Sequence, residues 1–321
     1  MNYISELYKQ GKIKSTPSYS ITTNGTIFSK EMFSFFNEHN FNVCFSLDGT
    51  AETHNILRPY KNGKGTYNTI QKNIQITQKL FPNIKLAYST TYTKIHYDQG
   101  LSINELRDFF NKEFNLKFGA IVPVMDVTQK EESYAVSDNN KLYDLLMEDK
   151  EVVWDSYIKG EPIIDTETMD FMMLFLKKGI SKYICQMGIT LITINSNGDI
   201  YPCQTLLNNQ EMIMGNIYNS KEENDDSFAQ YKNKTIRINK QENTTCKDCI
   251  AINFCQGCPS RWYYERNTFE PWSLFCKSIQ EQTRITLEKI ALLQRSPEIW
   301  TAFTSSVNSL NDIVKLLRSK N

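Results

Sequence analysis

The most informative stretch of this sequence reads Cys246-Lys-Asp-Cys249-Ile-Ala-Ile-Asn-Phe-Cys255-Gln-Gly-Cys258. Its spacing, C-x2-C-x5-C-x2-C, brings pairs of sulfur atoms within reach of one metal centre. Seven of the eight cysteines fall in the same region, and the three that lie outside this stretch are Cys185, Cys203 and Cys276. Distant single cysteines complete a coordination sphere once the chain folds back, so the pattern predicts a metal-binding module.

Two other interpretations of the cysteines remain open. Structural zinc also uses C-x2-C pairs, and one zinc site would take Cys246, Cys249, Cys255 and a fourth ligand, which leaves Cys185 and Cys203 without a role. Buried free thiols are a reasonable interpretation of the isolated Cys44 but not of a cluster of seven. A secreted disulfide scaffold is disfavoured, because a scaffold of this length would not place seven of its eight cysteines between 185 and 276.

The region before the cysteines predicts strands that alternate with helices. We expect strands near 19–23, 42–47, 85–91 and 116–124, a helix capped by Ser29, and helices near 66–80 and 104–114. In the second strand, the residues of one predicted face are Val43, Phe45 and Leu47. Such an order predicts a parallel sheet whose ligands gather at the carboxyl ends of the strands, where Asn24 and Asp48 lie.

The charge balance and the apolar runs of the sequence disfavour nucleic-acid and membrane partners. The chain has 36 basic and 36 acidic residues, so no overall field attracts it to nucleic acid or to an anionic membrane. The longest apolar runs are too short to cross a bilayer, and no signal pattern begins the sequence. We therefore expect no nucleic-acid partner, no membrane association and a cytoplasmic location.

The cysteine module resembles the SPASM domain of radical S-adenosylmethionine (radical SAM) enzymes that modify peptides. That family has a cysteine, a Gly-x4-Cys, a C-x2-C-x5-C-x3-C and a final cysteine. Here Gly198-x4-Cys203 and the segment Met214-Gly-Asn-Ile217 match it, whereas the last spacing, Cys255-x2-Cys258, is one residue shorter. The resemblance implies iron–sulfur clusters.

The resemblance also implies how the cysteines divide between two auxiliary 4Fe-4S clusters. The first would be held by Cys185, Cys203 and Cys258, and the second by Cys246, Cys249, Cys255 and Cys276. Family members that fully ligate the first cluster use one more cysteine shortly after the first, where this chain has Ile189 to Ile192. One iron is thus expected to be open to an outside ligand.

The upstream strands resemble the third and fourth units of the six-unit radical SAM barrel. The matching segments are Thr23-Asn-Gly25, Ser46-Leu-Asp-Gly49 with His54 and Arg58, and Gly65-Thr-Tyr67. By this analogy Asn24, Ser46 and Arg58 contact S-adenosylmethionine, although a turn asparagine, a strand serine and a solvated arginine are also ordinary residues. The expected fold is α/β: a partial (β/α)6 barrel of about four strand units, then a SPASM domain with a small β-hairpin and helices.

The sequence lacks the C-x3-C-x2-C motif that holds the cluster which reduces S-adenosylmethionine in this family, since Cys44 is the only cysteine before Cys185. The cofactor site is therefore expected to be incomplete. Met1 is expected to be an internal start or the start of a split or decayed gene, with a complementing N-terminal half as a partner. The expected domains are the partial barrel (1–125), a linker with bridging helices (126–184), the SPASM domain (185–280) and a helical tail (281–321).

Three functions follow from these features. The first is a radical SAM/SPASM peptide maturase, forming for example a thioether crosslink, which is inactive without its missing part. Sulfatase maturases of the family place an aspartate after the second cysteine, where this chain has Gln204, and glutamine cannot accept a proton. The alternatives are a non-catalytic iron–sulfur protein that binds a precursor peptide or partner enzyme, and a zinc-binding interaction protein.

Overall fold

The computed structural model describes residues 2–305 except 15, 16, 18, 125–132, 137, 160–162, 164, 178–181, 208, 235–238, 256, 272 and 302. The chain divides into two units. Unit 1 comprises residues 1–173 and 288–321, and unit 2 comprises residues 174–287. Parts of the predicted linker (126–132, 137, 160–162, 164 and 178–181) and of the predicted tail (302 and 306–321) lie outside the described residues.

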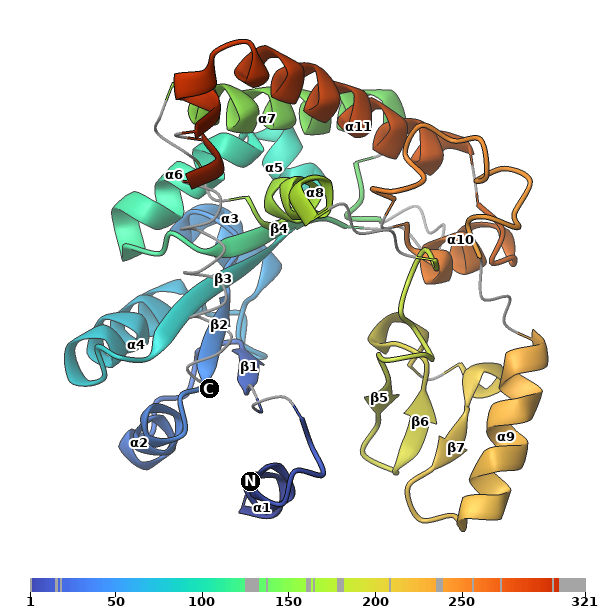
Figure 1. The fold of residues 1–321 in the computed structure, drawn as a ribbon. Helices are drawn as coiled ribbons and strands as arrows, with labels where there is room; N and C mark the ends of the chain where they lie inside the picture. The colour runs from blue at the N-terminus through green and yellow to red at the C-terminus, as the bar shows by residue number, and fades with distance from the viewer. Residues whose placement is uncertain are drawn as a thin grey trace. The chain divides into compact units, whose positions relative to one another are not determined.

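Unit 1 contains a four-stranded parallel sheet in the order β1-β2-β3-β4 (Figure 1). The strands are β1 (Ser20–Thr23), β2 (Asn42–Ser46), β3 (Lys85–Tyr92) and β4 (Gly119–Pro123). Their register places Ser46 beside Ser89 and Ser89 beside Ala120. The predicted parallel α/β sheet is confirmed.

Helices follow the strands as the sequence predicts. Those of unit 1 are α1 (Asn2–Lys9), α2 (Lys30–Glu38), α3 (Ala51–Leu57), α4 (Tyr67–Leu80), α5 (Lys94–Asp98), α6 (Ile103–Phe114) and α7 (Asn139–Ile158), with α8 (Thr166–Lys177) running on into unit 2. Ser29 caps α2 as predicted, because its hydroxyl accepts the Met32 N–H at 3.2 Å. A reciprocal capping box between Ser102 and Glu105 begins α6.

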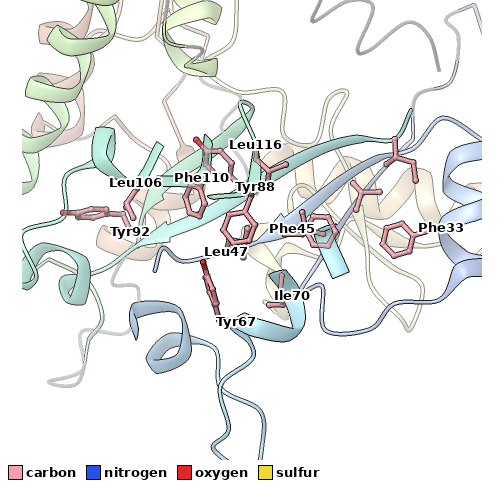
Figure 2. Packing of buried hydrophobic residues seen from close by; sticks show 14 of the residues in the cluster. Phe33, Phe45, Leu47, Tyr67, Ile70, Tyr88, Tyr92, Leu106, Phe110 and Leu116 are labelled. Atoms are coloured by element: carbon pink, nitrogen blue, oxygen red, sulfur yellow. The ribbon is translucent and has the colours of Figure 1, made fainter. Parts of the chain in front are cut away.

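One face of the sheet carries the core of unit 1. Buried side chains of α2, α4 and α6 pack there against β2 and β3, and Figure 2 shows Phe33, Ile70 and Phe110 among them. Phe110 stacks on Tyr88 with ring centroids 4.2 Å apart. The residues predicted to share this face, Val43, Phe45 and Leu47, are completely buried.

The other face of the sheet carries small and polar side chains. Cys44, Ser46, Ser89 and Ala120 are only half buried there, and alternation along each strand places them opposite the core. Gly25 shows how tightly the core side is packed: it has a φ of +70°, and a Cβ at this position would lie 2.7 Å from the Phe45 ring. The apolar core is therefore complete on one side, and the open side remains accessible to a polar ligand.

Unit 2 is built around a small antiparallel sheet in the order β5-β6-β7. Its strands are β5 (Thr193–Ile194), β6 (Asp199–Tyr201) and β7 (Gly215–Asn216). Its helices are α9 (Lys221–Lys234), α10 (Pro259–Arg266) and α11 (Ser273–Gln294), whose last residues belong to unit 1, with 3-10 turns at Gln204–Leu206 and Gln210–Met212.

Two details differ from the sequence prediction. The fourth strand was expected from 116, but α6 ends at Asn115 in a left-handed conformation, and the Leu116 N–H donates to the Phe110 carbonyl at 3.2 Å, so the strand begins only at Gly119. The predicted hairpin is a three-stranded sheet, because Gly215 and Asn216 pair with β6.

Candidate iron–sulfur and cofactor site

Four side chains and backbone groups hold Asp48 just beyond the carboxyl end of β2. The Asp48 N–H donates to Nδ1 of His54 at 3.1 Å, and Nε2 of His96 donates to the Asp48 carbonyl at 3.1 Å. The Asp48 carboxylate accepts the Thr91 N–H at 3.0 Å and forms an ion pair with Arg58. These contacts therefore hold both the backbone and the carboxylate of Asp48 in place.

Both histidines of this network are buried and neutral. Because Nδ1 of His54 accepts a hydrogen bond, its proton lies on Nε2, which faces the Thr66 hydroxyl at 3.0 Å, and that hydroxyl donates to the Arg58 carbonyl at 2.6 Å. Burial lowers the pKa of His54 to about 4; the nearby Asp48 opposes this and Arg58 adds to it. Burial likewise lowers the pKa of His96.

We expect mild acid to loosen the carboxyl ends of β2 and β3. In the unfolded chain a histidine takes up a proton near pH 6.5, but folded His54 stays neutral down to about pH 4. Stability is therefore fully present above pH 6.5 and is lost as the pH falls toward 4, by up to about 3 kcal/mol for His54. Hydrogen exchange of β2 and β3, corrected for the intrinsic rate, measures this loss between pH 7.5 and 4.5. In His54→Gln the pH dependence should become shallower, and an equally steep dependence in that variant would contradict the assignment.

The three residues predicted to contact S-adenosylmethionine lie at or beyond the strand ends. Asn24 is exposed, and its side-chain oxygen accepts the Thr26 N–H and hydroxyl at 3.2 and 2.9 Å, which makes a local turn. Ser46 ends β2 on the polar face of the sheet. Arg58 ends α3 with its side chain 33% exposed, so its ion pair with Asp48 still leaves part of the guanidinium accessible.

Four of the predicted cysteine ligands line one pocket in unit 2. They are Cys246, Cys249, Cys255 and Cys276, and the apolar walls include Ile184, Trp262 and Ile279. Successive turns place the first three, since the Cys249 N–H donates to the Cys246 carbonyl and the Cys255 N–H to the Ala251 carbonyl. Cys276 comes from α11.

Burial keeps thiols of this pocket protonated unless a metal takes the place of the proton. The Ala251 N–H and the Gln280 side-chain amide each donate to the Cys249 sulfur at 3.4 Å. Burial, together with nearby Cys255, Cys246 and Cys249, raises the pKa of the Cys276 thiol to about 12. Burial also raises the pKa of Cys246 to about 11. Such thiols are protonated at neutral pH unless a metal replaces the proton.

The other three cysteines form a second group. Cys203 follows β6 and is buried with Tyr201 and Leu206, and Cys185 packs against the same cluster. Burial raises the pKa of Cys185, as do the thiols of Cys258 and Cys203, which therefore lie near it. Cys258 caps α10, and its sulfur lies 3.1 Å from the Ser260 hydroxyl.

Four of the seven cysteines thus line one pocket, and the other three lie near one another in unit 2; which sulfur atoms hold which cluster stays a prediction. In the part of the chain that the structure describes, no group of three or more His, Cys, Asp or Glu side chains is arranged to hold a single metal ion.

Comparison with known proteins identifies the module. Residues 185–250 match the family model for SPASM, described as an iron-sulfur cluster-binding domain. Over 294 residues the chain is 26% identical to a cysteine-type anaerobic sulfatase-maturating enzyme of Clostridium novyi (strain NT), which covers 87% of this chain and 73% of that enzyme. The chain is therefore similar to sulfatase-maturating enzymes, and its residues 185–250 are similar to an iron–sulfur cluster-binding domain.

Solved structures show the same fold for this maturase-like chain. One is native anSMEcpe with bound AdoMet and a Kp18Cys peptide, at 19% identity and a TM-score of 0.67, covering 95% of this chain and 81% of that one. Another is Streptococcus suis SuiB bound to the precursor peptide SuiA, at 18% identity and a TM-score of 0.50, covering 80% and 58%. No described helix of the maturase-like chain is long and apolar enough to cross a membrane.

Two residues near these sites were not predicted from the sequence. His96 lies on α5, a helix too short to show a period, and only the Thr93-x-x-His96 spacing of its capping box gives a signal. Lys240 lines the four-cysteine pocket although its sequence context, Asn239-Lys-Gln-Glu-Asn243, looks like a solvated loop.

Proposed function

We propose that this chain is the cluster-bearing part of a radical SAM peptide maturase. The separation of the seven cysteines into a group of four and a group of three carries the proposal. On this view Cys246, Cys249, Cys255 and Cys276 hold one 4Fe-4S cluster, and Cys185, Cys203 and Cys258 hold another. Bound clusters of this kind supply one-electron chemistry and sites for sulfur ligands.

The polar side of the unit 1 sheet supports a place for S-adenosylmethionine. Ser46 and Ser89 stand side by side there, and the Asp48–Arg58 pair holds a partly exposed guanidinium at the carboxyl end of the sheet. A guanidinium binds a carboxylate with a planar pair of hydrogen bonds, which suits the amino acid portion of the cofactor. Asn24 is the weaker candidate, because its side chain already forms a turn.

A peptide is the proposed substrate, and a thioether crosslink the proposed product. Two observations support this proposal. Two similar structures hold peptides, and Gln204 is the residue that follows Cys203. Gln204 is exposed at the start of a 3-10 turn, and an amide cannot accept the proton released when a serine or cysteine is oxidised. Three cysteines would hold such a cluster with one iron left for an outside ligand, and a substrate thiolate bound there would be held near the carbon from which a hydrogen is removed.

The metal content tests the proposal. Anaerobically reconstituted protein should bind about eight irons and eight sulfides, because each 4Fe-4S cluster contains four of each. Iron and acid-labile sulfide are measured against protein concentration, with the broad absorption near 400 nm as a second readout. One zinc per chain without sulfide would favour the zinc-binding interaction protein instead.

We expect the chain alone not to cleave S-adenosylmethionine. Its printed sequence has no C-x3-C-x2-C motif, and homolytic cleavage needs an iron that binds the sulfonium cofactor. The measurement is 5′-deoxyadenosine formed under dithionite by the cluster-loaded protein, with apoprotein as the control. Formation above that control would contradict the expectation. A complementing N-terminal chain that restores the product would distinguish a split maturase from the non-catalytic iron–sulfur protein.

A further inference from the structure

Lys240 is a buried cation in the wall of the four-cysteine pocket. The residue is 1% exposed, and its ammonium donates to the Cys255 carbonyl at 3.3 Å. Among the described residues, no carboxylate lies within ion-pair distance of this ammonium. Keeping a buried lysine protonated without a counter-charge is costly, so an anion close to Lys240 would stabilise its positive charge.

The backbone holds Lys240 in this place. Asn239 forms an antiparallel bridge with Tyr183, and the Lys240 N–H donates to the Lys182 carbonyl at 3.0 Å. The bridge ties the segment before Cys246 to the segment before Cys185. Both ends of the contact belong to unit 2, so the lysine is fixed relative to the pocket that it lines.

We propose that Lys240 supplies the positive charge that offsets the second iron–sulfur cluster and raises its reduction potential. The inference rests on the proposed function, which places a cluster in this pocket. Four thiolates and the iron–sulfide core carry a net negative charge, and adding one electron increases it. A fixed cation in an apolar pocket therefore stabilises the reduced cluster more than the oxidised one.

The walls of the pocket strengthen this effect. Ile184, Ile252, Trp262 and Ile279 line it and keep the local dielectric low. A charge that water would screen at the surface acts strongly here. Lys247 provides a matched comparison, because it follows Cys246 directly but is exposed to solvent.

The test is a redox titration of the cluster-loaded full chain, in which dithionite supplies the electron and electron paramagnetic resonance reports each cluster. Two variants remove the charge: Lys240→Gln, which keeps a donor for the Cys255 carbonyl, and Lys240→Met, which keeps the chain length. In both, the ratio of reduced to oxidised second cluster at a fixed potential should fall at least tenfold, equivalent to about 59 mV for one electron. The reduction potential of the first cluster should not change in any variant. In Lys240→Arg and Lys247→Met, the potential of the second cluster should also stay close to that of the parent protein.

The outcomes separate the two proposals. Parent protein that binds no iron and sulfide contradicts the proposed function and the role of Lys240 with it. Two loaded clusters with an unchanged potential in both neutral variants overturn the role of Lys240 alone. Loss of the second cluster in the neutral variants but not in Lys240→Arg supports a required charge. Its loss in Lys240→Arg as well would show that the fit of the lysine side chain, and not its charge, keeps the cluster in place, and would overturn the proposed role.

Discussion

Replacing Cys249 with alanine should remove about half of the iron and sulfide and leave a single cluster. Cys249 is one of four thiols around the four-cysteine pocket, and its sulfur accepts two hydrogen bonds from protein N–H groups, so its loss removes a ligand and leaves two donors without their acceptor. The three cysteines of the other group remain in place. Because each group would ligate its own iron, we expect the first cluster to survive.

Iron, sulfide and the reduced electron paramagnetic resonance spectrum measure this outcome, and two other variants serve as comparisons. Cys203→Ala should remove the other half, and Cys44→Ala, which lies on β2 in unit 1, should remove none. Complete loss of iron in Cys249→Ala would mean that the two groups do not form independent sites.

Replacing Arg107 with methionine should destabilise unit 1 by about 3–5 kcal/mol. Arg107 on α6 donates to both carboxylate oxygens of Asp149 on α7, at 2.5 and 2.8 Å, and reaches Asp165 at 3.3 Å. Lys150 completes the cluster at 2.8 Å from Asp165. All four side chains are 14% exposed or less, so removing one cation leaves a carboxylate buried without its partner.

The pKa of Asp165 supports a charged carboxylate in this cluster. Burial alone would raise the pKa of Asp165, but Lys150 and Arg107 outweigh it and hold that pKa well below its ordinary value. Asp165 also caps α8, since the Thr168 N–H and hydroxyl donate to it at 2.8 and 2.6 Å. Loss of Arg107 should therefore weaken the start of α8 as well as the contact between α6 and α7.

Urea unfolding monitored by circular dichroism measures the effect of Arg107→Met. The control is Lys112→Met on the same helix, whose side chain is 79% exposed and 3.9 Å from Asp108, and which should change stability by less than about 1 kcal/mol. Arg107→Lys should fall between the two, because it keeps the charge but not the bidentate fork. A small effect in Arg107→Met, equal to that of the control, would show that water reaches the cluster.

The four strands and the helices α2, α4 and α6 of unit 1 could be predicted because their signals are local. Val43, Phe45 and Leu47 alternate along one strand, and Ser29 marks a helix start, so period and capping suffice. The short helices α3 and α5 were not predicted, since seven and five residues do not complete a recognisable apolar period. They form because loops after β2 and β3 close onto Asp48 through His54 and His96.

The cysteine positions were also predictable, whereas their surroundings were not. The spacing of the cysteines can be read directly from the sequence. The charged groups near their sulfur atoms come from other segments, which only the fold brings close. Lys240 stands in a polar run that resembles a surface loop, and only the bridge to Tyr183 brings it into the pocket. Arg107 and Asp165 are 58 residues apart, and no local pattern connects them.

The cysteines of the two groups are interleaved along the sequence, so they are not synthesised one group after the other. Cys185 and Cys203 emerge first, but Cys258, the third member of their group, follows Cys246, Cys249 and Cys255 of the other group. Neither group is therefore a contiguous segment that could fold on the nascent chain by itself. Under this assignment, one cluster cannot be complete before Cys258 has been synthesised, and the other cannot be complete before Cys276.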